Sequence, residues 1–274
     1  MFLKYEIDYA HAVQRILQNG VVKDGRNGLT KSIFGMSLEI DLTTGVMPLI
    51  QGRKMFHRGI LGEFAALIRR PTNIADFELW GCNYWGKWAN HETGALVLDY
   101  GNSWFDFNGV NQIKELKRAL CNNPNDRRMI VNAWRPDRLS KLSLPCCHYS
   151  YQFNVEEGKL NMIWTQRSAD MMIGVPADMV LAAIWVITLA NEVGLEPGRI
   201  KMDLGDCHVY EEHTANAYKY LYNVLEKEHN LETWTYPKYK LLSPKGLDFC
   251  NFVPADIHID SYSHVEKLDF ELKG

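Results

Sequence analysis

The sequence lacks the features that mark membrane, secreted and zinc-binding proteins. Its longest apolar run, residues 179–190, has twelve residues, whereas a membrane-spanning helix needs roughly 20, so we expect a buried helix there. The N-terminus has neither the positive start nor the long apolar core of a signal peptide. The six cysteines are scattered without the spacing of zinc ligands. We therefore expect a cytoplasmic protein with reduced thiols, no bound metal and no membrane contact.

A strong excess of positive charge is also absent. The chain has 30 Lys and Arg against 33 Asp and Glu, a formal net charge of −3, which gives no basic field for binding nucleic acid. Any anionic ligand must then be held by a local group of arginines. No linker, charge block or low-complexity segment interrupts the sequence, so we expect one domain, 1–274.

Apolar spacing predicts helices and strands in mixed order. The predicted helices cover residues 7–19, 58–69, 111–121, 176–193 and 209–226. The predicted strands cover residues 32–42, 128–134, 148–155 and 159–166. Residues 23–32 read as a turn-rich loop. Because strands and helices do not alternate strictly, a mixed α/β or α+β sheet protein fits best.

The segment 144–168 holds the residues best suited to covalent chemistry. Two adjacent cysteines, Cys146 and Cys147, precede His148 at the predicted start of a strand. Nearby cations lower the pKa of a thiol and enlarge its nucleophilic thiolate fraction, so either cysteine is a candidate nucleophile. Most free cysteines, however, are small buried hydrophobes, and spacing alone does not decide between these interpretations.

Arginines form the second candidate group. An arginine fork matches two phosphate oxygens at once, and a serine hydroxyl adds a further hydrogen bond. A converging group of arginines would also depress the pKa of a neighbouring cysteine. Taken singly, each arginine is expected to be a solvated surface residue. The candidates are Arg26, Arg127, Arg128, Arg167 and Ser168.

Several ordered motifs resemble the thymidylate synthase superfamily. The matching segments are KDGRNGLTKSIFG, RKMFHRGILGEFAALIRRPTNIADFELWGCNYWGKWA, PNDRRMIVNAWRPDRLSKLSLPCCHYSYQF, GKLNMIWTQRSADMMIGVPADMVLAAIWVITLANEVGLEPGRI and LGDCHVYEEH. The similarity runs from about residue 10 to 222 and is weaker beyond. It implies a thymidylate synthase-like mixed sheet with flanking helices, in a homodimer packed sheet to sheet.

The resemblance also implies which residues carry the reaction. Cys147 matches the nucleophile, whereas Cys146 occupies a position that the family usually gives to another residue. Arg127 and Arg128 match arginines that reach the nucleotide phosphate from the neighbouring subunit, which implies an obligate homodimer with shared sites. The phosphate ligands from the same subunit would be Arg26, Arg167 and Ser168.

Three further groups of residues are implied in the same way. The sugar 3′-hydroxyl of the nucleotide would be bound by His208 and Tyr210. Protons would be moved around the base by Glu63, Tyr100 and Gln166. The folate would be contacted by Trp85, Trp88, Asp170 and Gly174.

Pyrimidine chemistry explains why such a site needs a thiolate. C5 is too weak a nucleophile to attack a one-carbon donor unaided, but addition of sulfur at C6 breaks the ring conjugation and gives C5 enamine character. C5 then takes the one-carbon unit of 5,10-methylenetetrahydrofolate and is left with an exocyclic methylene. Hydride converts this methylene into a methyl group, as in thymidylate synthases, whereas water converts it into a hydroxymethyl group.

The main departure from thymidylate synthases is Ala177-Asp178, where those enzymes typically carry Phe-Asn. An asparagine amide matches N3–H and O4 of uracil, whereas cytosine presents the reverse pattern. A carboxyl group accepts from the cytosine amino group and, when protonated, shares a proton with N3. Since an unpaired partner costs about 1–3 kcal/mol, Asp178 is expected to favour cytosine, as in the cytidylate hydroxymethylases. The alternative is that Asp178 only stabilises the N-terminus of the predicted helix 176–193.

Smaller departures bear on the sugar and the folate. Ala177 leaves room for a ribose 2′-hydroxyl and so favours CMP slightly over dCMP, unless a neighbouring side chain fills the gap. The C-terminus, residues 261–274, is charged where thymidylate synthases end in a short apolar tail, which fits a site that admits water. Phe56 stands where the family often has a folate-facing His.

The sequence therefore predicts a hydroxymethylase that converts CMP or dCMP with 5,10-methylenetetrahydrofolate and water. Within the family, the alternatives are a thymidylate synthase acting on dUMP and a dUMP hydroxymethylase. A nucleotide sensor or RNA-binding regulator on the same scaffold is the alternative of another class. Against it stands the intact set of Cys147, Arg167, Asp170, His208 and Tyr210.

Overall fold

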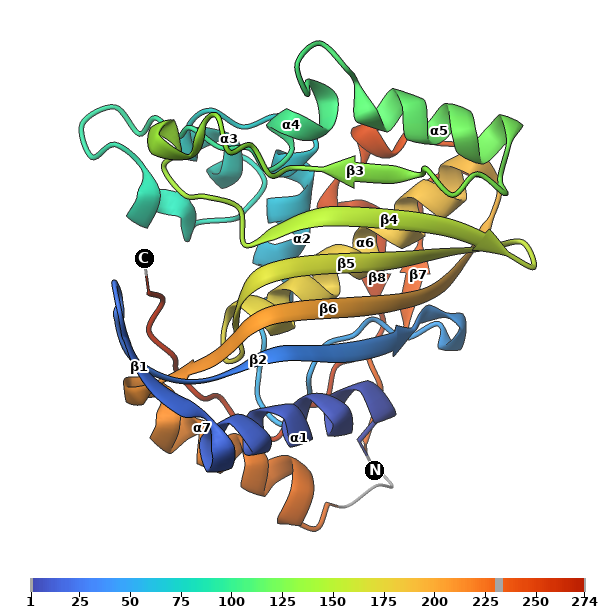
Figure 1. Ribbon diagram of the computed structural model, residues 1–274. Helices are drawn as coiled ribbons and strands as arrows, with labels where there is room; N and C mark the ends of the chain where they lie inside the picture. Colours follow the sequence, from blue (N-terminus) through green and yellow to red (C-terminus); the bar gives the residue numbers. More distant parts are fainter. Residues whose placement is uncertain (1, 230–233, 274) are drawn as a thin grey trace.

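A six-stranded mixed sheet forms the centre of the computed structural model, which describes residues 2–229 and 234–273 (Figure 1). The strand order is β1-β2-β6-β5-β4-β3. The strands are β1 Val21–Gly25, β2 Gly28–Asp41, β3 Ile130–Asn132, β4 His148–Glu156, β5 Lys159–Asp170 and β6 Glu196–Tyr210. β5 and β6 pair in parallel, and the other neighbours pair antiparallel. The predicted mixed sheet is thus confirmed.

Helices and a small second sheet surround this centre. The helices are α1 Lys4–Asn19, α2 His57–Leu67, α3 Ile74–Glu78, α4 Asn102–Phe105, α5 Gln112–Asn122, α6 Gly174–Val193 and α7 Thr214–Leu221. Shorter helical turns are η1 Leu42–Thr44, η2 Trp85–Trp88, η3 Leu139–Lys141, η4 Glu211–His213, η5 Tyr222–Glu226, η7 Phe249–Asn251 and η8 Pro254–Asp256. The small sheet pairs β7 Tyr239–Leu241 with β8 Ile257–Ile259.

The core helix is α6, which makes the crossover that joins the parallel strands β5 and β6. It packs against both of these strands and against α2. Every residue from Met179 to Ala190 is buried, as expected from the apolar run. By length and composition α6 could cross a membrane, but 83% of its apolar window is buried inside the fold. Its hydrophobicity therefore serves the core.

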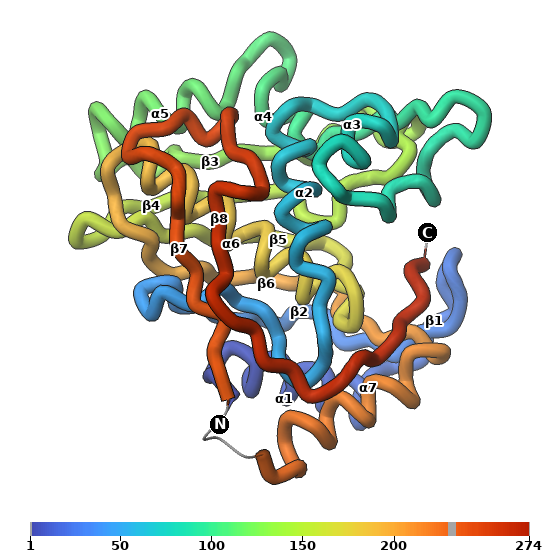
Figure 2. Tube along the Cα trace, turned by 180° about the vertical axis from the view of Figure 1, so that it is seen from behind, coloured from blue at the N-terminus to red at the C-terminus, as the bar shows by residue number. Residues whose placement is uncertain are grey.

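The two faces of the sheet are unequal. α2 and α6 lie behind the sheet in Figure 1 and in front of it in Figure 2, and no described helix lies over the opposite face at β4 and β5. Side chains of β5 alternate between buried and more exposed positions along most of its length. The face without helices carries Ile163, which is 37% exposed.

Two local predictions were wrong. Residues 23–32 form the β1–β2 hairpin around an Arg26-Asn27 turn rather than a loop. Gly28 supplies the positive φ of 111° beside that turn. The helix predicted over 209–226 begins only at Thr214, because Val209 and Tyr210 end β6.

β6 itself was not predicted, although it is central to the sheet. Its sequence contains Pro197, Gly198 and Gly205, which argue against a strand. The structure explains both glycines, because β5 approaches β6 closely at these positions. A Cβ at Gly205 would lie 2.7 Å from the carbonyl oxygen of Arg167, and a Cβ at Gly198 would lie 2.2 Å from Oδ1 of Asn161. Only glycine allows β5 to lie so close at these points.

Candidate active site

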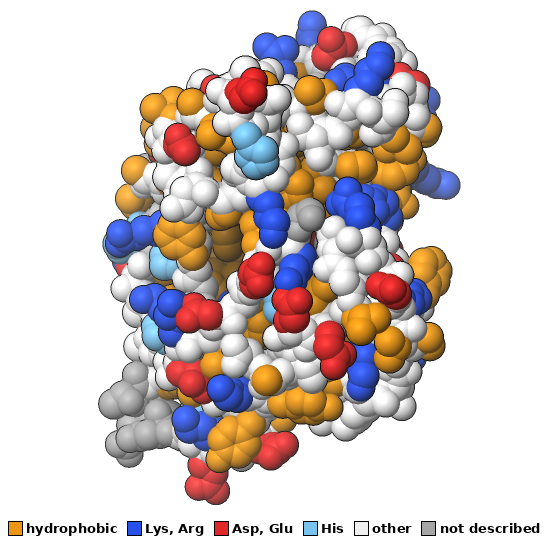
Figure 3. Space-filling view, turned by 90° about the vertical axis from the view of Figure 1, so that its left-hand side faces the viewer, with side chains coloured by type: hydrophobic (Ala, Val, Ile, Leu, Met, Phe, Trp, Pro, Cys, Tyr) orange, Lys and Arg blue, Asp and Glu red, His pale blue; other side chains and the backbone are white. Residues whose placement is uncertain are grey.

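A cavity of about 770 Å³ opens beside α2, the start of α6 and the ends of β4, β5 and β6. Figure 3 shows this side of the molecule hollowed, with charged side chains of both signs on the rim. The volume lies in the upper part of the range of about 300–1,000 Å³ that is typical of ligand pockets. The cavity therefore has room for more than a nucleotide.

Nearly all the residues predicted from the sequence line this one cavity. They come from segments that are far apart in the chain: Arg26, Phe56, Glu63, Trp85, Trp88, Tyr100, Cys147, Gln166, Arg167, Ser168, Asp170, Gly174, Ala177, Asp178, His208 and Tyr210. Sequence reasoning missed Arg53 and Tyr84, which also line it. Tyr84 precedes Trp85 directly, but nothing in its spacing distinguished it from a core aromatic.

Arg127 and Arg128 do not line the cavity of their own chain. Both are exposed in the turn before the edge strand β3. Arg128 forms an ion pair with Asp126, with Nη2 and Oδ2 2.9 Å apart.

The structure distinguishes the two cysteines. The thiol of Cys147 faces the cavity, while Cys146 is buried and points its Sγ to the carbonyl of Ala133, 3.8 Å away. The backbone around Cys147 is fixed: its N–H donates to the hydroxyl of Tyr100, and its carbonyl accepts from the N–H of Arg167 at 2.8 Å. Cys147 is the thiol in position to attack a ligand.

The prediction that nearby arginines lower the pKa of the nucleophilic cysteine is wrong. Burial raises the pKa of the Cys147 thiol, and the cation of Arg167 opposes this only in part. Arg167 is engaged elsewhere as well: its Nε donates to the carbonyl of Cys146 at 2.8 Å and its Nη2 to that of Pro145 at 3.0 Å. This arginine thus holds the segment that carries the nucleophile.

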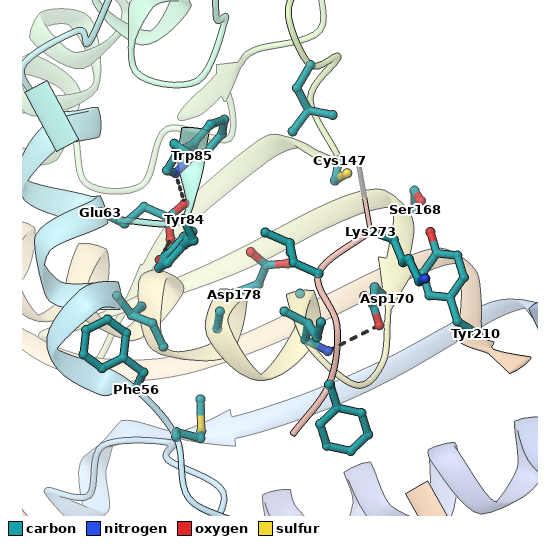
Figure 4. Close-up of a pocket in the computed structure, with 18 of the residues that line it drawn as sticks. Phe56, Glu63, Tyr84, Trp85, Cys147, Ser168, Asp170, Asp178, Tyr210 and Lys273 are labelled. Atoms are coloured by element: carbon teal, nitrogen blue, oxygen red, sulfur yellow. Dashed lines mark hydrogen bonds between the residues drawn. The ribbon is translucent and has the colours of Figure 1, made fainter. Parts of the chain in front are cut away.

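The side of the cavity with exposed cations is built by β1, β2, β5 and β6. Arg26 lies at the tip of the hairpin, and Tyr210, at the end of β6, lies within electrostatic reach of it. The ring of His208 is directed by its Nδ1, which lies 3.1 Å from the carbonyl oxygen of Asp206. Figure 4 places Ser168 and Tyr210 on this side. These groups suit an anionic and hydroxylated ligand.

The opposite side holds the buried carboxyl of Glu63 (Figure 4). Its Oε2 accepts from the hydroxyl of Tyr84 at 2.5 Å and its Oε1 from Nε1 of Trp85 at 2.8 Å. Burial raises the pKa of Glu63 to about 7, although both hydrogen bonds favour the carboxylate. A carboxyl with this pKa can both take and give a proton near neutral pH.

A second buried carboxyl, Asp178, lies between the two sides. Its Oδ2 accepts from Nε2 of Gln166 at 2.6 Å, and Oε1 of Gln166 accepts in turn from Nε1 of Trp164 at 3.1 Å. Burial raises the pKa of Asp178 well above its ordinary value, and the negative charge of Glu63 adds to this effect. Its Oδ1 lies 3.8 Å from Nε2 of His148, whose pKa burial lowers to about 3. His148 is therefore neutral and does not ionise Asp178.

These contacts bear on the alternative role of Asp178 as a helix-stabilising residue. Asp178 lies in the second turn of α6, and the first turn contains no acidic residue. Its recorded hydrogen bond goes to the sheet, through Gln166, and not to the N–H groups that begin the helix. The contacts therefore favour a role in the cavity.

Aromatic and apolar residues line the part of the cavity next to Glu63. Trp85 stacks on Phe77 at 4.8 Å between ring centroids, and Trp88 lies 5.3 Å from Trp85. Nε1 of Trp88 is buried without a partner in the described part of the chain. Phe56 and Ile60 extend the apolar wall. Such a surface suits a flat aromatic ligand.

The C-terminal segment crosses the cavity, and several of its residues line it. Three side chains hydrogen-bond to backbone carbonyl oxygens of this segment. Nζ of Lys87 lies 2.6 Å from the oxygen of Leu272, and Nδ2 of Asn216 lies 2.7 Å from the oxygen of Asp269. Nε2 of His213 lies 2.9 Å from the oxygen of Glu271. The guanidinium of Arg53 lies over the ring of Phe270. The charged tail is therefore part of the wall of the site.

A family model for thymidylate synthase matches residues 7–273. The chain belongs to the thymidylate synthase family. It is therefore a folate-dependent enzyme that transfers a one-carbon unit to a pyrimidine nucleotide, with 5,10-methylenetetrahydrofolate as co-substrate. The match covers more of the chain than the motifs alone, which end near residue 222. Among the described residues no group of His, Cys, Asp and Glu side chains is arranged to hold a metal ion.

Proposed function

We propose that this member of the family is a cytidylate 5-hydroxymethylase. The reaction is CMP or dCMP plus 5,10-methylenetetrahydrofolate and water, giving the 5-hydroxymethyl nucleotide and tetrahydrofolate. The observation that carries the proposal is the carboxyl of Asp178, which is buried in the cavity and oriented by Gln166, and whose pKa burial raises well above its ordinary value. A neutral carboxyl offers one donor and one acceptor to the N3 and amino group of cytosine.

The other residues have complementary tasks in this proposal. Cys147 adds to C6 of the base, and Glu63 exchanges protons with the reacting groups. Burial raises the pKa of the Cys147 thiol, so the reaction needs a group within the site that accepts the thiol proton as sulfur bonds to C6. Arg26 and Arg167 with Ser168 bind the phosphate, whereas His208 and Tyr210 hold the sugar.

The apolar wall fits the folate. Trp88 is partly exposed and lines the cavity beside the more deeply buried Trp85, so the two indoles give this wall an aromatic surface. Asp170 uses its Oδ1 to accept from the N–H of Met172 at 2.9 Å, which orders the turn before Gly174 at that wall. When bound, the folate supplies the one-carbon unit.

The sugar preference rests on Ala177. Its side chain lines the cavity and is partly exposed, which supports open space beside it. A ribose 2′-hydroxyl needs such space. We therefore propose CMP ahead of dCMP.

We also propose that the enzyme is a cytoplasmic homodimer packed sheet to sheet. The sheet face without helices and the exposed apolar side chains Phe34 (79%), Ile130 (47%) and Ile163 (37%) support this arrangement. It would bring Arg127 and Arg128 of each subunit to the phosphate in the site of the other.

A substrate panel tests the function. The protein is incubated with CMP, dCMP or dUMP and 5,10-methylenetetrahydrofolate, and the product is identified by mass together with dihydrofolate absorbance. Hydroxymethylated cytidylate without dihydrofolate is the expected result. Methylated dUMP with dihydrofolate would instead identify a thymidylate synthase, and hydroxymethylated dUMP would mean that Asp178 does not select the base.

A further inference from the structure

The carboxyl of Glu63 is clamped by two adjacent residues, Tyr84 and Trp85, which donate to different oxygens. All three residues line the cavity, and Glu63 is only 7% exposed. Figure 4 shows Tyr84 and Trp85 on the two sides of the carboxyl. Both hydrogen bonds must therefore persist, or change direction, when Glu63 gains or loses a proton.

The two partners differ in what they permit. An indole N–H only donates, so Oε1, which faces Trp85, is an acceptor in both ionisation states of Glu63. The acidic proton must then reside on Oε2, which faces Tyr84 at 2.5 Å. A phenol both donates and accepts, so Tyr84 can donate to the carboxylate and accept from the acid.

A third group completes the chain behind Tyr84. The thiol of Cys82 is fully buried beside Tyr84, and each of the two groups affects the pKa of the other. Burial raises the pKa of Cys82 far above its ordinary value, so it remains a thiol, which both donates and accepts weakly. The hydrogen bond between Tyr84 and Glu63 can therefore reverse direction next to a neutral neighbour, without creating a second charge.

We propose that Tyr84 is a positioning residue of the reaction: its hydroxyl, backed by Cys82, reverses its hydrogen bond each time Glu63 gains or loses a proton. The inference deepens the proposed function and rests on it for the step concerned. As water adds to the exocyclic methylene, a C–O bond forms, one O–H bond of the water breaks, and its proton goes to Oε2 of Glu63. The π pair of the methylene moves to form the C5–C6 double bond, and the sulfur of Cys147 leaves C6 as a thiolate. Tyr84 then accepts from that proton and keeps the carboxyl in place.

The variant Tyr84→Phe tests this, with Tyr218→Phe as the matched control, because Tyr218 is 50% exposed and outside the cavity. Using the nucleotide turned over in the panel, kcat should fall at least about tenfold, as expected for a misplaced catalytic group, while KM for the nucleotide changes little. The hydrogen bond of Tyr84 lowers the pKa of Glu63, so its loss should move the acidic limb of the kcat profile to higher pH. The other titratable groups that affect Glu63 are Cys82 and Asp178; repeating the profile in Asp178→Asn removes the second.

An infrared titration reads Glu63 without turnover. The carboxylic acid band that disappears in Glu63→Gln reports its protonation, and Tyr84→Phe should shift the midpoint of that band upward while Tyr218→Phe should not. An unchanged midpoint overturns the inference, and so does a shifted midpoint with wild-type kcat. If no nucleotide in the panel is turned over, the proposed function fails, and the infrared midpoint alone decides whether Tyr84 controls the proton of Glu63.

Discussion

The two sides of the cavity hold charge in opposite ways. Arg26 and Arg167 are exposed side chains, at a hairpin tip and on a strand, and Arg167 also donates to two backbone carbonyls. Glu63 and Asp178 are 7% and 8% exposed, and burial raises the pKa of both carboxyls. The exposed side is suited to affinity for any nucleotide phosphate. The buried side, where an unmatched polar atom is costly, is suited to selecting the base.

The largest effect is expected at Cys147, on which both sides depend. Cys147→Ser should lower kcat by about 10³-fold or more, the scale seen on removing a catalytic nucleophile, because a serine hydroxyl is far less ionised than a thiol. Nucleotide binding, measured by calorimetry, should persist because the arginines and carboxyls are untouched. Cys121→Ser, at an exposed thiol, is the control. Full activity in Cys147→Ser would contradict the covalent mechanism.

Asp178→Asn should change the selective side alone. An amide matches uracil rather than cytosine, so the ratio of kcat/KM for cytidylate to that for dUMP should fall by about 10- to 100-fold, from roughly 1–3 kcal/mol per mismatched partner. The affinity for inorganic phosphate should not change comparably in this variant, because the arginines on the exposed side are untouched. An equal loss of kcat/KM for cytidylate and for dUMP would show that Asp178 supports the fold and does not select the base.

The pH dependence of binding sharpens the same comparison. Because the pKa of Asp178 is raised, its protonated form is present at low pH and is lost as pH rises through the raised value. The affinity for CMP should therefore fall with rising pH above the ordinary carboxyl range, and the fall should be absent in Asp178→Asn. The measurement is calorimetry across the pH range, with dUMP as the reference ligand. A pH-independent affinity in the wild type would mean that Asp178 binds cytosine as a carboxylate.

The exposed side is predicted to be completed by a second subunit. Cys147→Ser and the double variant Arg127→Ala, Arg128→Ala should each be poorly active alone. After mixing and subunit exchange, half of the dimers are mixed and each has one intact site, so activity should recover to about a quarter of wild type. A mixture that stays at the level of its parents would place these arginines outside the site.

The sequence predicted the residues that line the cavity and the fold class, but not every strand that supports them. Ordered motifs identified the cavity residues from Arg26 to Tyr210, because a family keeps residue types where chemistry requires them. β6 escaped prediction because Gly198 and Gly205 are required by the approach of β5, a tertiary constraint without local signal. The raised pKa of Cys147 escaped for a related reason, since burial is decided by packing and not by the number of nearby arginines. Tyr84 matters only through its contact with Glu63, 21 residues away in sequence.

The smallest effect is expected at Ala177, where the sugar meets the start of α6. Ala177→Phe fills space in the cavity, and overpacking costs about 1–3 kcal/mol, so kcat/KM for CMP should fall about tenfold relative to dCMP. The 2′-hydroxyl alone distinguishes the two nucleotides, so the phosphate and base contacts cancel in the ratio. Ala177→Ser, which adds little volume, should leave the ratio near that of the wild type. If Ala177→Phe lowers kcat/KM equally for CMP and dCMP, the cavity does not distinguish the sugars at this position. The preference for CMP must then lie with His208 and Tyr210.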